Sequence, residues 1–463
     1  MNKSSQSYFL AGICGVGMSS LALLLKSEGN SVRGSDIITE GSEVERLKMR
    51  GIPVFSEKEG ADTLAEKDIL VVSSAIHLDN QVLLAAQKAN LTIKHRADVL
   101  AEITDGHFLI AVSGTHGKTT TSGMVGYVLS QLGYQPIIYV GGKIMGFNDY
   151  FPENNQEHLF NGKQIMVIET DESDASFLKF HPDIAIVTNI DRDHLGTYEE
   201  SFDNLINAFA QFTQQCEEKD GFVIGYGDDP NVKTIVGRTK RHILYGSSET
   251  NDVCVNYNTT NNSIAAMGKE EDFTLKMEKG DEKSYLNAVA TIIVCQVLDI
   301  SSEAACKILA QFPGMERRMQ VLAEQRGITI LSDHADHPTE IKATLQAVTA
   351  RYPNRRLLLI LQPHRYTRVT DCLSGYAEAL EGVSNLILLD IFPAGESCAN
   401  PEALNQSLRD SISQKIGSAL LPLASPEALF ATITDFVKSG DIVLFMGPGD
   451  IGKLAQTFGE TWQ

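Results

Sequence analysis

The sequence lacks a long hydrophobic run. Nowhere do its 463 residues approach the roughly 18 consecutive apolar residues that a membrane-spanning helix needs. The N-terminal stretch has one early lysine and a short apolar run that passes into a glycine-rich turn, so no signal peptide is predicted. With 43% hydrophobic and 21% charged residues, the composition is that of a soluble globular protein and excludes a disordered chain. We expect no membrane insertion and about three domains, at roughly 100–200 residues per domain.

Positive charge and paired cysteines are also scarce. The chain has 39 Lys and Arg residues against 59 Asp and Glu residues, a formal charge of -20, which disfavours binding to nucleic acid or anionic lipid. An anionic substrate would therefore need a locally basic pocket. The cysteines are widely spaced, and no CxxC pair occurs among Cys14, Cys216, Cys254, Cys295, Cys306, Cys372 and Cys398. They are predicted to be reduced thiols of a cytoplasmic protein, not disulfides or zinc ligands.

Three consecutive segments each alternate strands with helices. Residues 7–36 are predicted to form strand, glycine turn, helix and strand, which is a βαβ unit. The second segment starts with an apolar strand at 108–112, and the third has four strands with helical stretches such as 338–350 and 371–380. The polar stretch 247–285 predicts a small β-meander or loop-rich insertion. The predicted fold class is α/β in three domains, the first and last Rossmann-like: 1–105, 106–313 and 314–463.

A shortened phosphate loop lies between the strand at 108–112 and the next helix. Its glycines let backbone N–H groups surround phosphate oxygens, Lys118 can neutralise the phosphates, and Thr119 can offer a hydroxyl to Mg²⁺. The loop has two fewer spacer residues than GxxxxGK[ST], and a plain turn before a helix is the alternative. We predict a central domain of the P-loop ATPase type that binds ATP through Gly114, Thr115, His116, Gly117, Lys118, Thr119 and Thr120.

A second glycine turn, Gly12–Gly17, follows the first strand. It resembles a dinucleotide-binding turn, but Cys14 replaces one glycine. A pyrophosphate could still approach Gly15 and Gly17, and Asp36 stands where a ribose or similar group would be bound. A turn needed only for helix–strand packing is the alternative.

Polar clusters follow two buried strands of the central segment. One cluster is Glu169–Asp174, with four carboxylates, and the other is Asn189–His194. Open α/β sheets bind ligands at the carboxyl ends of their strands, and carboxylate oxygens suit a divalent cation. A solvated acidic face and a hydrogen-bonded core histidine are the alternatives.

The third segment carries two further polar clusters after strands. In Ser332–Glu340, two Asp and two His could chelate a metal, as in metal phosphoesterases. In Gln362–Arg368, two arginines could bind a carboxylate or phosphate in bidentate fashion. Capping of a helix is the alternative for each, and Pro338 at a helix start supports it. Gly447–Gly452 is predicted to form a tight turn.

Together these motifs resemble the Mur ligase family, and within it the branch that joins L-alanine to UDP-N-acetylmuramate. The resemblance covers nearly the whole chain. Its motifs are the Gly12–Gly17 turn, Ser73–Ile76, Gly114–Thr120, Glu169–Phe177, Thr188–Tyr198, Phe312–Gln320, His337–Glu340, Gln362–Arg368 and Pro393–Glu396. DESDASF and QPHRYTR look specific to that branch.

The resemblance implies an ATP-dependent amide ligation in peptidoglycan precursor synthesis. The lactyl carboxylate of UDP-N-acetylmuramate would attack the γ-phosphate of ATP, and the amine of L-alanine would displace phosphate from the acyl phosphate. The first domain would bind the UDP part through Gly15, Gly17, Asp36, Ser73 and Ser74. The partners would be these substrates, with a monomer or weak homodimer and no nucleic acid.

The resemblance also assigns roles to residues of the other two domains. Lys118 would stabilise the transferring phosphoryl group, Thr119 and Glu169 would hold one Mg²⁺, and His194 would hold a second, with Mn²⁺ as a substitute. Arg317, Arg318 and Asp333 would reach toward ATP. On the amino-acid side, Arg365 and Arg368 would bind the alanine carboxylate, with Asp336 and His337 beside them.

This chain departs from the family pattern at several positions. Where the family usually has DDYGHHPTE, Ser332, His334 and Asp336 replace an Asp, the Tyr and the first His. The usual PGxHNxxN stretch is replaced over 280–287, which puts the adenine contacts in doubt. Three alternatives follow: a ligase that prefers glycine or serine, an impaired relative that only binds the UDP-sugar, and a metal phosphoesterase using Asp333, His334, Asp336 and His337.

Overall fold

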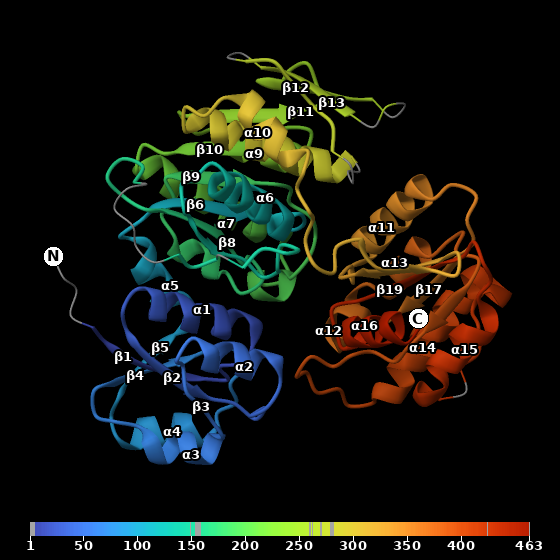
Figure 1. Ribbon diagram of the computed structural model, residues 1–463, viewed down its shortest axis with the longest axis horizontal. Helices are drawn as coiled ribbons and strands as arrows, with labels where there is room; N and C mark the ends of the chain where they lie inside the picture. The colour runs from blue at the N-terminus through green and yellow to red at the C-terminus, as the bar shows by residue number, and fades with distance from the viewer. Residues whose placement is uncertain are drawn as a thin grey trace. The chain divides into compact units, whose positions relative to one another are not determined.

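The computed structural model contains three β-sheets surrounded by helices, and its chain forms two compact units, Met1–Pro313 and Gly314–Gln463 (Figure 1). The first unit holds two sheets and the second holds one. This confirms the predicted α/β class. The structure describes residues 5–148, 150–152, 159–258, 261, 263–268, 271–277, 282–423 and 425–462, and only the backbone of Ser42.

The N-terminal sheet is parallel, with the order β3-β2-β1-β4-β5. Its strands are β1 (Ser7–Ala11), β2 (Ser31–Ser35), β3 (Val54–Phe55), β4 (Asp68–Val72) and β5 (Thr92–His95). Its helices are α1 (Val16–Ser27), α2 (Ser42–Met49), α3 (Glu57–Thr63), α4 (Gln81–Lys88) and α5 (Arg96–Thr104). The first polar side chains after β1 and β2 therefore lie at one edge, because the carboxyl ends of parallel strands meet there.

The central sheet has the order β14-β13-β12-β11-β10-β9-β6-β8-β7. Its parallel strands are β6 (Phe108–Ser113), β7 (Ile137–Tyr139), β8 (Ile165–Glu169), β9 (Ile184–Val187), β10 (Phe222–Tyr226) and β11 (His242–Gly246). An antiparallel extension follows in β12 (Val253–Asn258), β13 (Ser263–Gly268) and β14 (Phe273–Leu275). The β-meander predicted at the edge of this segment is confirmed.

Helices cover the central sheet and close its core. They are α6 (Lys118–Gln131), η2 (Ser176–Lys179), η3 (Leu195–Tyr198), α7 (Phe202–Glu218), α8 (Pro230–Val236), α9 (Glu282–Val297) and α10 (Ser302–Leu309). The strands β6, β8 and β9 are apolar up to Ser113 and Glu169, which end β6 and β8, because both of their faces are covered, as parallel strands require. Phosphate-loop and polar-cluster residues therefore follow strands that lie in the core of the domain.

A contact between the N-terminal and central domains involves the glycine turn. The Tyr139 hydroxyl donates to the carbonyl of Gly17 (2.8 Å) and accepts from the Arg96 guanidinium (3.2 Å). A Cβ atom at residue 17 would lie 2.7 Å from Arg96 Nη1, so a larger residue there would push the Arg96 guanidinium aside. Lys179 and Asp98 form an ion pair across the same junction. Tyr139 and Arg96 were not predicted from the sequence.

The second unit has the sheet order β15-β16-β19-β17-β18, parallel except for β15. Its strands are β15 (Gln320–Gln325), β16 (Ile328–Asp333), β17 (Leu357–Leu361), β18 (Leu386–Leu388) and β19 (Ile442–Met446). Its helices are α11 (Pro338–Arg351), α12 (Tyr366–Asp371), α13 (Leu373–Ala379), α14 (Pro401–Ile416), η4 (Gly417–Ala419), η5 (Pro426–Ala428), α15 (Leu429–Phe436) and α16 (Ile451–Thr461).

One predicted helix of this unit differs in the structure. Residues 371–380 were predicted as one helix, but the helical stretch begins earlier, at Tyr366, and is interrupted at Cys372. Cys372 ends α12 and precedes α13 with φ of -114° and ψ of 21°, outside the α-helical region. The arginine-bearing loop therefore leads directly into a short helix.

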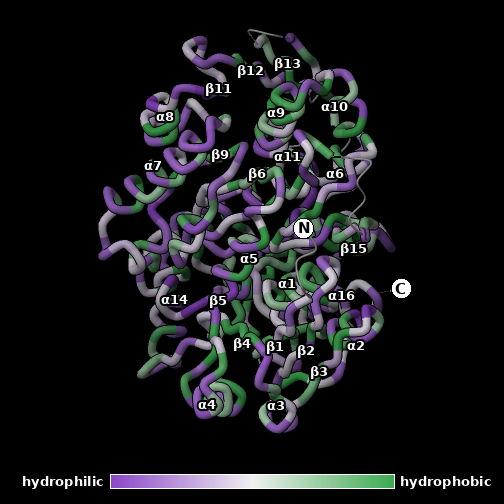
Figure 2. The backbone as a smooth tube through the Cα atoms, turned by 90° about the vertical axis from the view of Figure 1, so that its left-hand side faces the viewer, coloured by the Kyte–Doolittle hydropathy of each residue, from purple (hydrophilic) through white to green (hydrophobic). Residues whose placement is uncertain are grey.

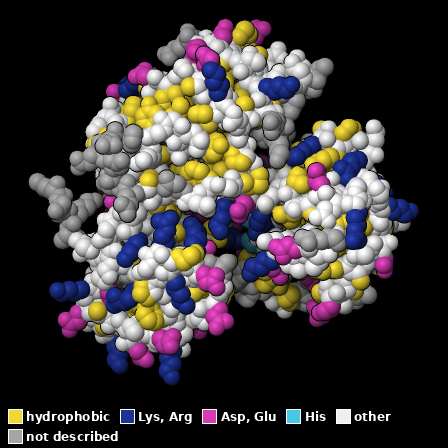
Figure 3. Space-filling model, in the orientation of Figure 1, with side chains coloured by type: hydrophobic (Ala, Val, Ile, Leu, Met, Phe, Trp, Pro, Cys, Tyr) yellow, Lys and Arg dark blue, Asp and Glu magenta, His cyan; other side chains and the backbone are white. Residues whose placement is uncertain are grey.

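The surface of the first unit differs between its two domains. On the face drawn in Figure 3, hydrophobic side chains gather over the central domain, whereas the N-terminal domain presents basic and acidic side chains side by side. In Figure 2, outer helices such as α4 alternate between hydrophobic and hydrophilic residues, as one-sided burial requires. No helix among the described residues is both long and apolar enough to cross a membrane.

Candidate active site

The phosphate loop is held against the end of β9. Backbone N–H groups of Thr115 and His116 donate to the carbonyl and side-chain oxygens of Asn189 (3.0 and 2.8 Å). A Cβ atom at Gly114, whose φ is +134°, would lie 2.1 Å from Thr188 Oγ1. Gly114 is thus required both for its backbone conformation and for this close approach. The strand–loop–helix arrangement predicted for the P-loop is present.

Lys118 begins α6, and its ammonium group has three acceptors. Its Nζ donates to the carbonyls of Gly114 (2.6 Å) and Thr115 (3.2 Å) and to Glu172 Oε2 (2.7 Å). Burial by itself would lower the pKa of Lys118, but the charge of Glu172 outweighs it and raises the pKa. Burial raises the pKa of Glu172 to about 7 despite the neighbouring ammonium. The sequence placed Glu172 in an acidic cluster but gave no sign that it faces Lys118.

Thr119 and Glu169 meet beside this lysine. The Thr119 hydroxyl donates to Glu169 Oε1 (2.7 Å), and Gly141 N–H donates to Glu169 Oε2 (2.7 Å). A hydroxyl and a carboxylate at the carboxyl ends of β6 and β8 are hard oxygen donors of the kind that Mg²⁺ prefers. The donor set therefore fits the predicted metal ion. Thr120 follows in the first turn of α6.

His194 and His116 lie on loops around the same edge of the sheet. His194 precedes η3 with φ of +56°, and its Nε2 lies 3.4 Å from Asp193 Oδ2. His116 Nε2 lies 3.3 Å from Asp191 Oδ2, while Asp191 N–H donates to Thr115 Oγ1 (2.8 Å). The polar cluster at 189–194 thus contacts the phosphate loop directly. The role of His194 as a ligand of a second metal ion stays a prediction.

One residue at this site was missed by the sequence reasoning. Asn287 lies on α9, and its Oδ1 would be 3.0 Å from a Cβ atom added at Gly117, so it borders the phosphate loop. It occupies the last position of the stretch 280–287, where the family pattern also has Asn, and that match was the signal available. Gly280 and Asp281 lie outside the described residues.

Asp36 holds the glycine turn of the N-terminal domain, and its role in binding the UDP part stays a prediction. Asp36 Oδ2 accepts from Cys14 N–H (2.8 Å) and Oδ1 accepts from Ile38 N–H (3.0 Å), and the residue is buried. Its carboxylate therefore holds the turn around Gly15, the residue before α1. At the end of β4, Ser73 O accepts from Ile76 N–H (3.1 Å) and Ser74 Oγ lies 3.2 Å from His95 Nε2.

Asp333 and Arg317 hold backbone segments together in the second unit. Asp333 is buried and accepts from the N–H groups of Met319 (2.7 Å) and Ala335 (2.9 Å). Arg317 Nη2 donates to the carbonyls of Gly447 (2.6 Å) and Gly449 (3.3 Å), on the predicted tight turn. Both residues were predicted near ATP, and both have structural partners. Arg318 Nη1 lies 3.9 Å from Glu340 Oε1.

Asp336 is paired inside the second unit. Its carboxylate forms an ion pair with Arg368 and lies 3.5 Å from His364 Nδ1. Burial would raise the pKa of Asp336, but the neighbouring His364 imidazole and the charge of Arg368 lower it below its ordinary value. Arg365, in contrast, is exposed on the same loop, with φ of +65°. The two arginines of the motif therefore have different surroundings.

The side chains predicted to form a metal cluster in this unit do not meet at one site. Asp333 binds backbone N–H groups, Asp336 pairs with Arg368, and His337 caps α11 by accepting from Thr339 N–H (3.3 Å). Burial, together with the charges of Arg318 and Arg317, lowers the pKa of His334 to about 3. These side chains have separate partners, so the phosphoesterase interpretation is wrong on geometry. The capping role that the sequence allowed for His337 is confirmed.

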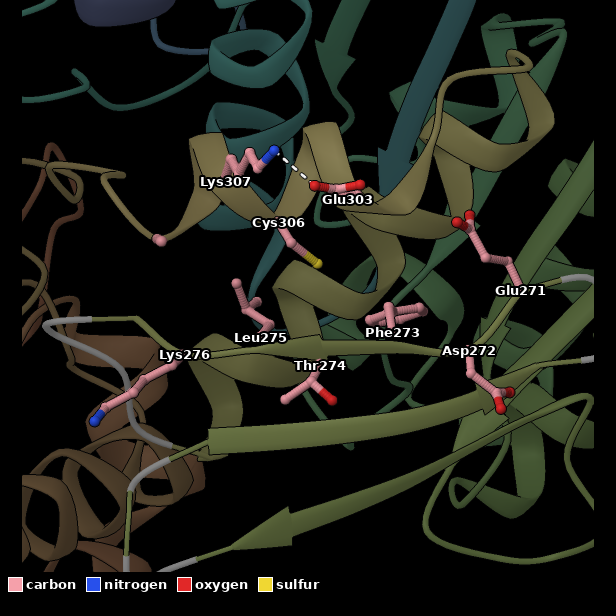
Figure 4. Close-up of a pocket in the computed structure, with 10 residues that line it drawn as sticks. Glu271, Asp272, Phe273, Thr274, Leu275, Lys276, Glu303, Cys306 and Lys307 are labelled. Atoms are coloured by element: carbon pink, nitrogen blue, oxygen red, sulfur yellow. Dashed lines mark ion pairs between the residues drawn. The ribbon is translucent and has the colours of Figure 1, made fainter.

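A cavity of about 540 Å³ lies away from these residues, between β14 and α10 (Figure 4). Glu303 and Lys307 form an ion pair on its wall (2.6 Å), and Glu271 Oε2 accepts from Ser302 N–H at the start of α10. It contains none of the predicted site residues.

Comparison with known proteins covers almost the whole chain. Residues 8–108 match the description "Mur ligase family, catalytic domain", residues 112–295 the "Mur ligase middle domain" and residues 317–449 "Mur ligase, glutamate ligase domain". The chain belongs to the Mur ligase family.

Individual relatives of this Mur ligase share its full length. UDP-N-acetylmuramate--L-alanine ligases from Coxiella burnetii and a Psychrobacter species are 35% and 33% identical to it over 97% of this chain, covering 97% and 94% of the relatives. The crystal structure of the alanine ligase MurC from Thermotoga maritima has a TM-score of 0.79 at 25% identity, over 99% of both chains. A murein peptide ligase from Psychrobacter arcticus shares the fold, with a TM-score of 0.74 at 21% identity over 98% of both chains.

Proposed function

We propose that this Mur ligase joins L-alanine to the lactyl carboxylate of UDP-N-acetylmuramate with conversion of ATP to ADP and phosphate, in cytoplasmic peptidoglycan precursor synthesis. The observation that carries the proposal is 35% identity over 97% of both chains to a ligase of that name. The phosphate loop supports it, because Lys118, Thr119 and Glu169 have the positions that phosphoryl transfer needs.

In this proposal, residues of the central domain perform the phosphoryl transfer. The lactyl carboxylate attacks the γ-phosphorus, the bond to the β-phosphate oxygen breaks, and an acyl phosphate and ADP result. Lys118 donates to the transferring phosphoryl oxygens, and loop N–H groups bind the phosphates. Thr119 and Glu169 would hold Mg²⁺, which supplies neutralisation of phosphate charge. His194 would bind a second metal ion.

The second unit would then bind the amino acid. Arg365 is exposed and can pair with the carboxylate of L-alanine, while Arg368 is oriented by Asp336. The alanine nitrogen attacks the acyl carbon, and phosphate leaves as the amide forms. Since the negative charge of Asp336 is already paired with Arg368, its presence gives no reason to expect a preference for glycine or serine.

The deciding experiment measures phosphate release from ATP with Mg²⁺ and UDP-N-acetylmuramate, with and without L-alanine, glycine or serine. We expect release that requires both the nucleotide sugar and an amino acid, fastest with L-alanine. Faster release with glycine or serine would establish an altered preference. Binding of UDP-N-acetylmuramate without any release would establish the impaired relative.

Replacing Glu169 by Gln tests the proposed metal site. The amide keeps a hydrogen bond to Thr119 but loses the negative charge, so the Mg²⁺ concentration for half-maximal phosphate release should rise about tenfold or more. The measurement is a Mg²⁺ titration of phosphate release. As a control, Glu303→Gln removes an exposed carboxylate of α10 and should leave the titration unchanged. An unchanged midpoint in Glu169→Gln would remove Glu169 from the metal site.

A further inference from the structure

All three N–H donors of Lys118, the P-loop lysine, form hydrogen bonds within the protein. An ammonium group has three N–H donors, and those of Lys118 meet Gly114 O, Thr115 O and Glu172 Oε2. A phosphate oxygen can therefore accept from Lys118 only if one of these acceptors gives way.

Two of the three acceptors are held in place by the loop itself. The loop backbone is attached to the end of β9, where Thr188 Oγ1 donates to His116 O (2.6 Å) and Asn189 accepts from the loop N–H groups. Moving Gly114 O or Thr115 O would disturb this attachment. The Glu172 carboxylate, in contrast, is joined to the main chain through rotatable side-chain bonds, so its displacement from Lys118 does not require the main chain to move.

The backbone of Glu172 is fixed even though its side chain can turn. Its carbonyl accepts from Ala175 N–H (3.1 Å) and from the Tyr198 hydroxyl (2.5 Å). Glu172 is only 2% exposed, so solvent does not compete for its carboxylate. The pair is thus a buried anion held at a set distance from the cation that binds phosphate.

We propose that Glu172 is a positioning residue for the P-loop lysine, and that a nucleotide phosphate binds Lys118 by replacing the Glu172 carboxylate. The inference rests on the proposed function only in that the ligand is a nucleotide. It assigns Glu172 two effects. Glu172 keeps the ammonium aimed across the loop, and it competes with phosphate for that ammonium, which weakens nucleotide binding.

Burial gives this competition a pH dependence. A buried carboxylate that loses its cation takes up a proton, because the charged form is poorly solvated there. The pKa of Glu172 is raised to about 7 by burial even with Lys118 in place, so displacement should be coupled to proton uptake near neutral pH. The groups that act on Glu172 or on its immediate partners are Lys118 of α6, Asp171 and Asp174 of the same loop, Tyr198 and His194 of the η3 region, Glu169, and Arg96 of α5.

The test compares binding of MgADP to the full-length protein and to Glu172→Gln at pH 8.0 and 6.5, by calorimetry. The neutral amide holds Lys118 less strongly than a carboxylate does, so Glu172→Gln should bind MgADP about tenfold more tightly at pH 8.0. At pH 6.5, where wild-type Glu172 is partly protonated, the difference should shrink. The matched control is Asp174→Asn, an exposed carboxylate of the same loop that contacts Ser176 N–H and not Lys118.

Each result decides the proposal. Equal or weaker binding by Glu172→Gln at pH 8.0, or the same tightening in Asp174→Asn, would overturn it. If Glu172→Gln does not fold, the wild-type protein suffices: binding heats in two buffers of different ionisation enthalpy should show net proton uptake at pH 8.0, and none would overturn it. Because MgADP binding requires neither UDP-sugar nor amino acid, this result is independent of the phosphate-release experiment.

Discussion

Replacing Lys118 by Ala should lower kcat/KM for ATP at least ~10³-fold, because the variant loses the only side-chain cation donating to the phosphate loop among the described hydrogen bonds. The loss should be mostly in kcat, since the ammonium stabilises charge that develops on the transferring group. The measurement is phosphate release with UDP-N-acetylmuramate and L-alanine at varied ATP.

Two further variants distinguish a loss of catalysis from a loss of folding in Lys118→Ala. Lys307→Ala removes an exposed lysine of α10 that pairs with Glu303 and should keep full activity. Lys118→Ala leaves Glu172 buried without its cation, and adding Glu172→Gln should restore thermal stability but not activity. Retention of more than a few per cent of activity in Lys118→Ala would place the phosphoryl-transfer site elsewhere.

Replacing Asp336 by Asn should destabilise the second unit by about 3 kcal/mol, because the half-buried Arg368 guanidinium loses its ion pair with Asp336. The chain has a single tryptophan, Trp462, which packs against Phe458 in this unit. Urea unfolding followed by tryptophan fluorescence therefore reports on the second unit. Asp435→Asn, which changes an exposed aspartate of α15, is the matched control and should leave the midpoint unchanged.

The effect of Asp336→Asn should depend on pH in a definite direction. The pKa of Asp336 is lower in the folded protein than its ordinary value, so its ionised form stabilises the fold above the ordinary carboxyl pKa. That contribution is lost as the pH falls through the folded pKa. Wild type and variant should therefore differ at pH 7 and converge in acid; a difference that grows in acid would contradict the pairing with Arg368.

Much of the fold could be predicted because its signals are local. Apolar strands such as β6 and β19 are short buried runs followed by glycine-rich turns, and the phosphate loop lies within seven consecutive residues. A β-meander was one of the two structures predicted for 247–285, because the polar, Thr-rich pattern there is incompatible with a core helix, and the structure forms it as β12–β14. These features depend on neighbours in the sequence.

The partners of the charged residues could not be predicted, because they come from distant parts of the chain. Glu172 meets a lysine 54 positions away, and Asp336 meets an arginine 32 positions away. Four carboxylates in Glu169–Asp174 look alike in the sequence, yet one faces the lysine, one faces Thr119, and others bind backbone N–H groups of their own loop. Only the packing of strands beside one another distinguishes them.

The Gly17–Arg96–Tyr139 contact has a consequence for protein engineering. A chimera that joins the N-terminal domain of one Mur ligase to the central domain of another takes Gly17 and Arg96 from the first parent and Tyr139 from the second. A central domain with Phe at that position would leave the Gly17 carbonyl and the Arg96 guanidinium without the hydroxyl that joins them. Parents whose residues at positions 17, 96 and 139 can form this contact can therefore be chosen from their sequences before a chimeric gene is assembled.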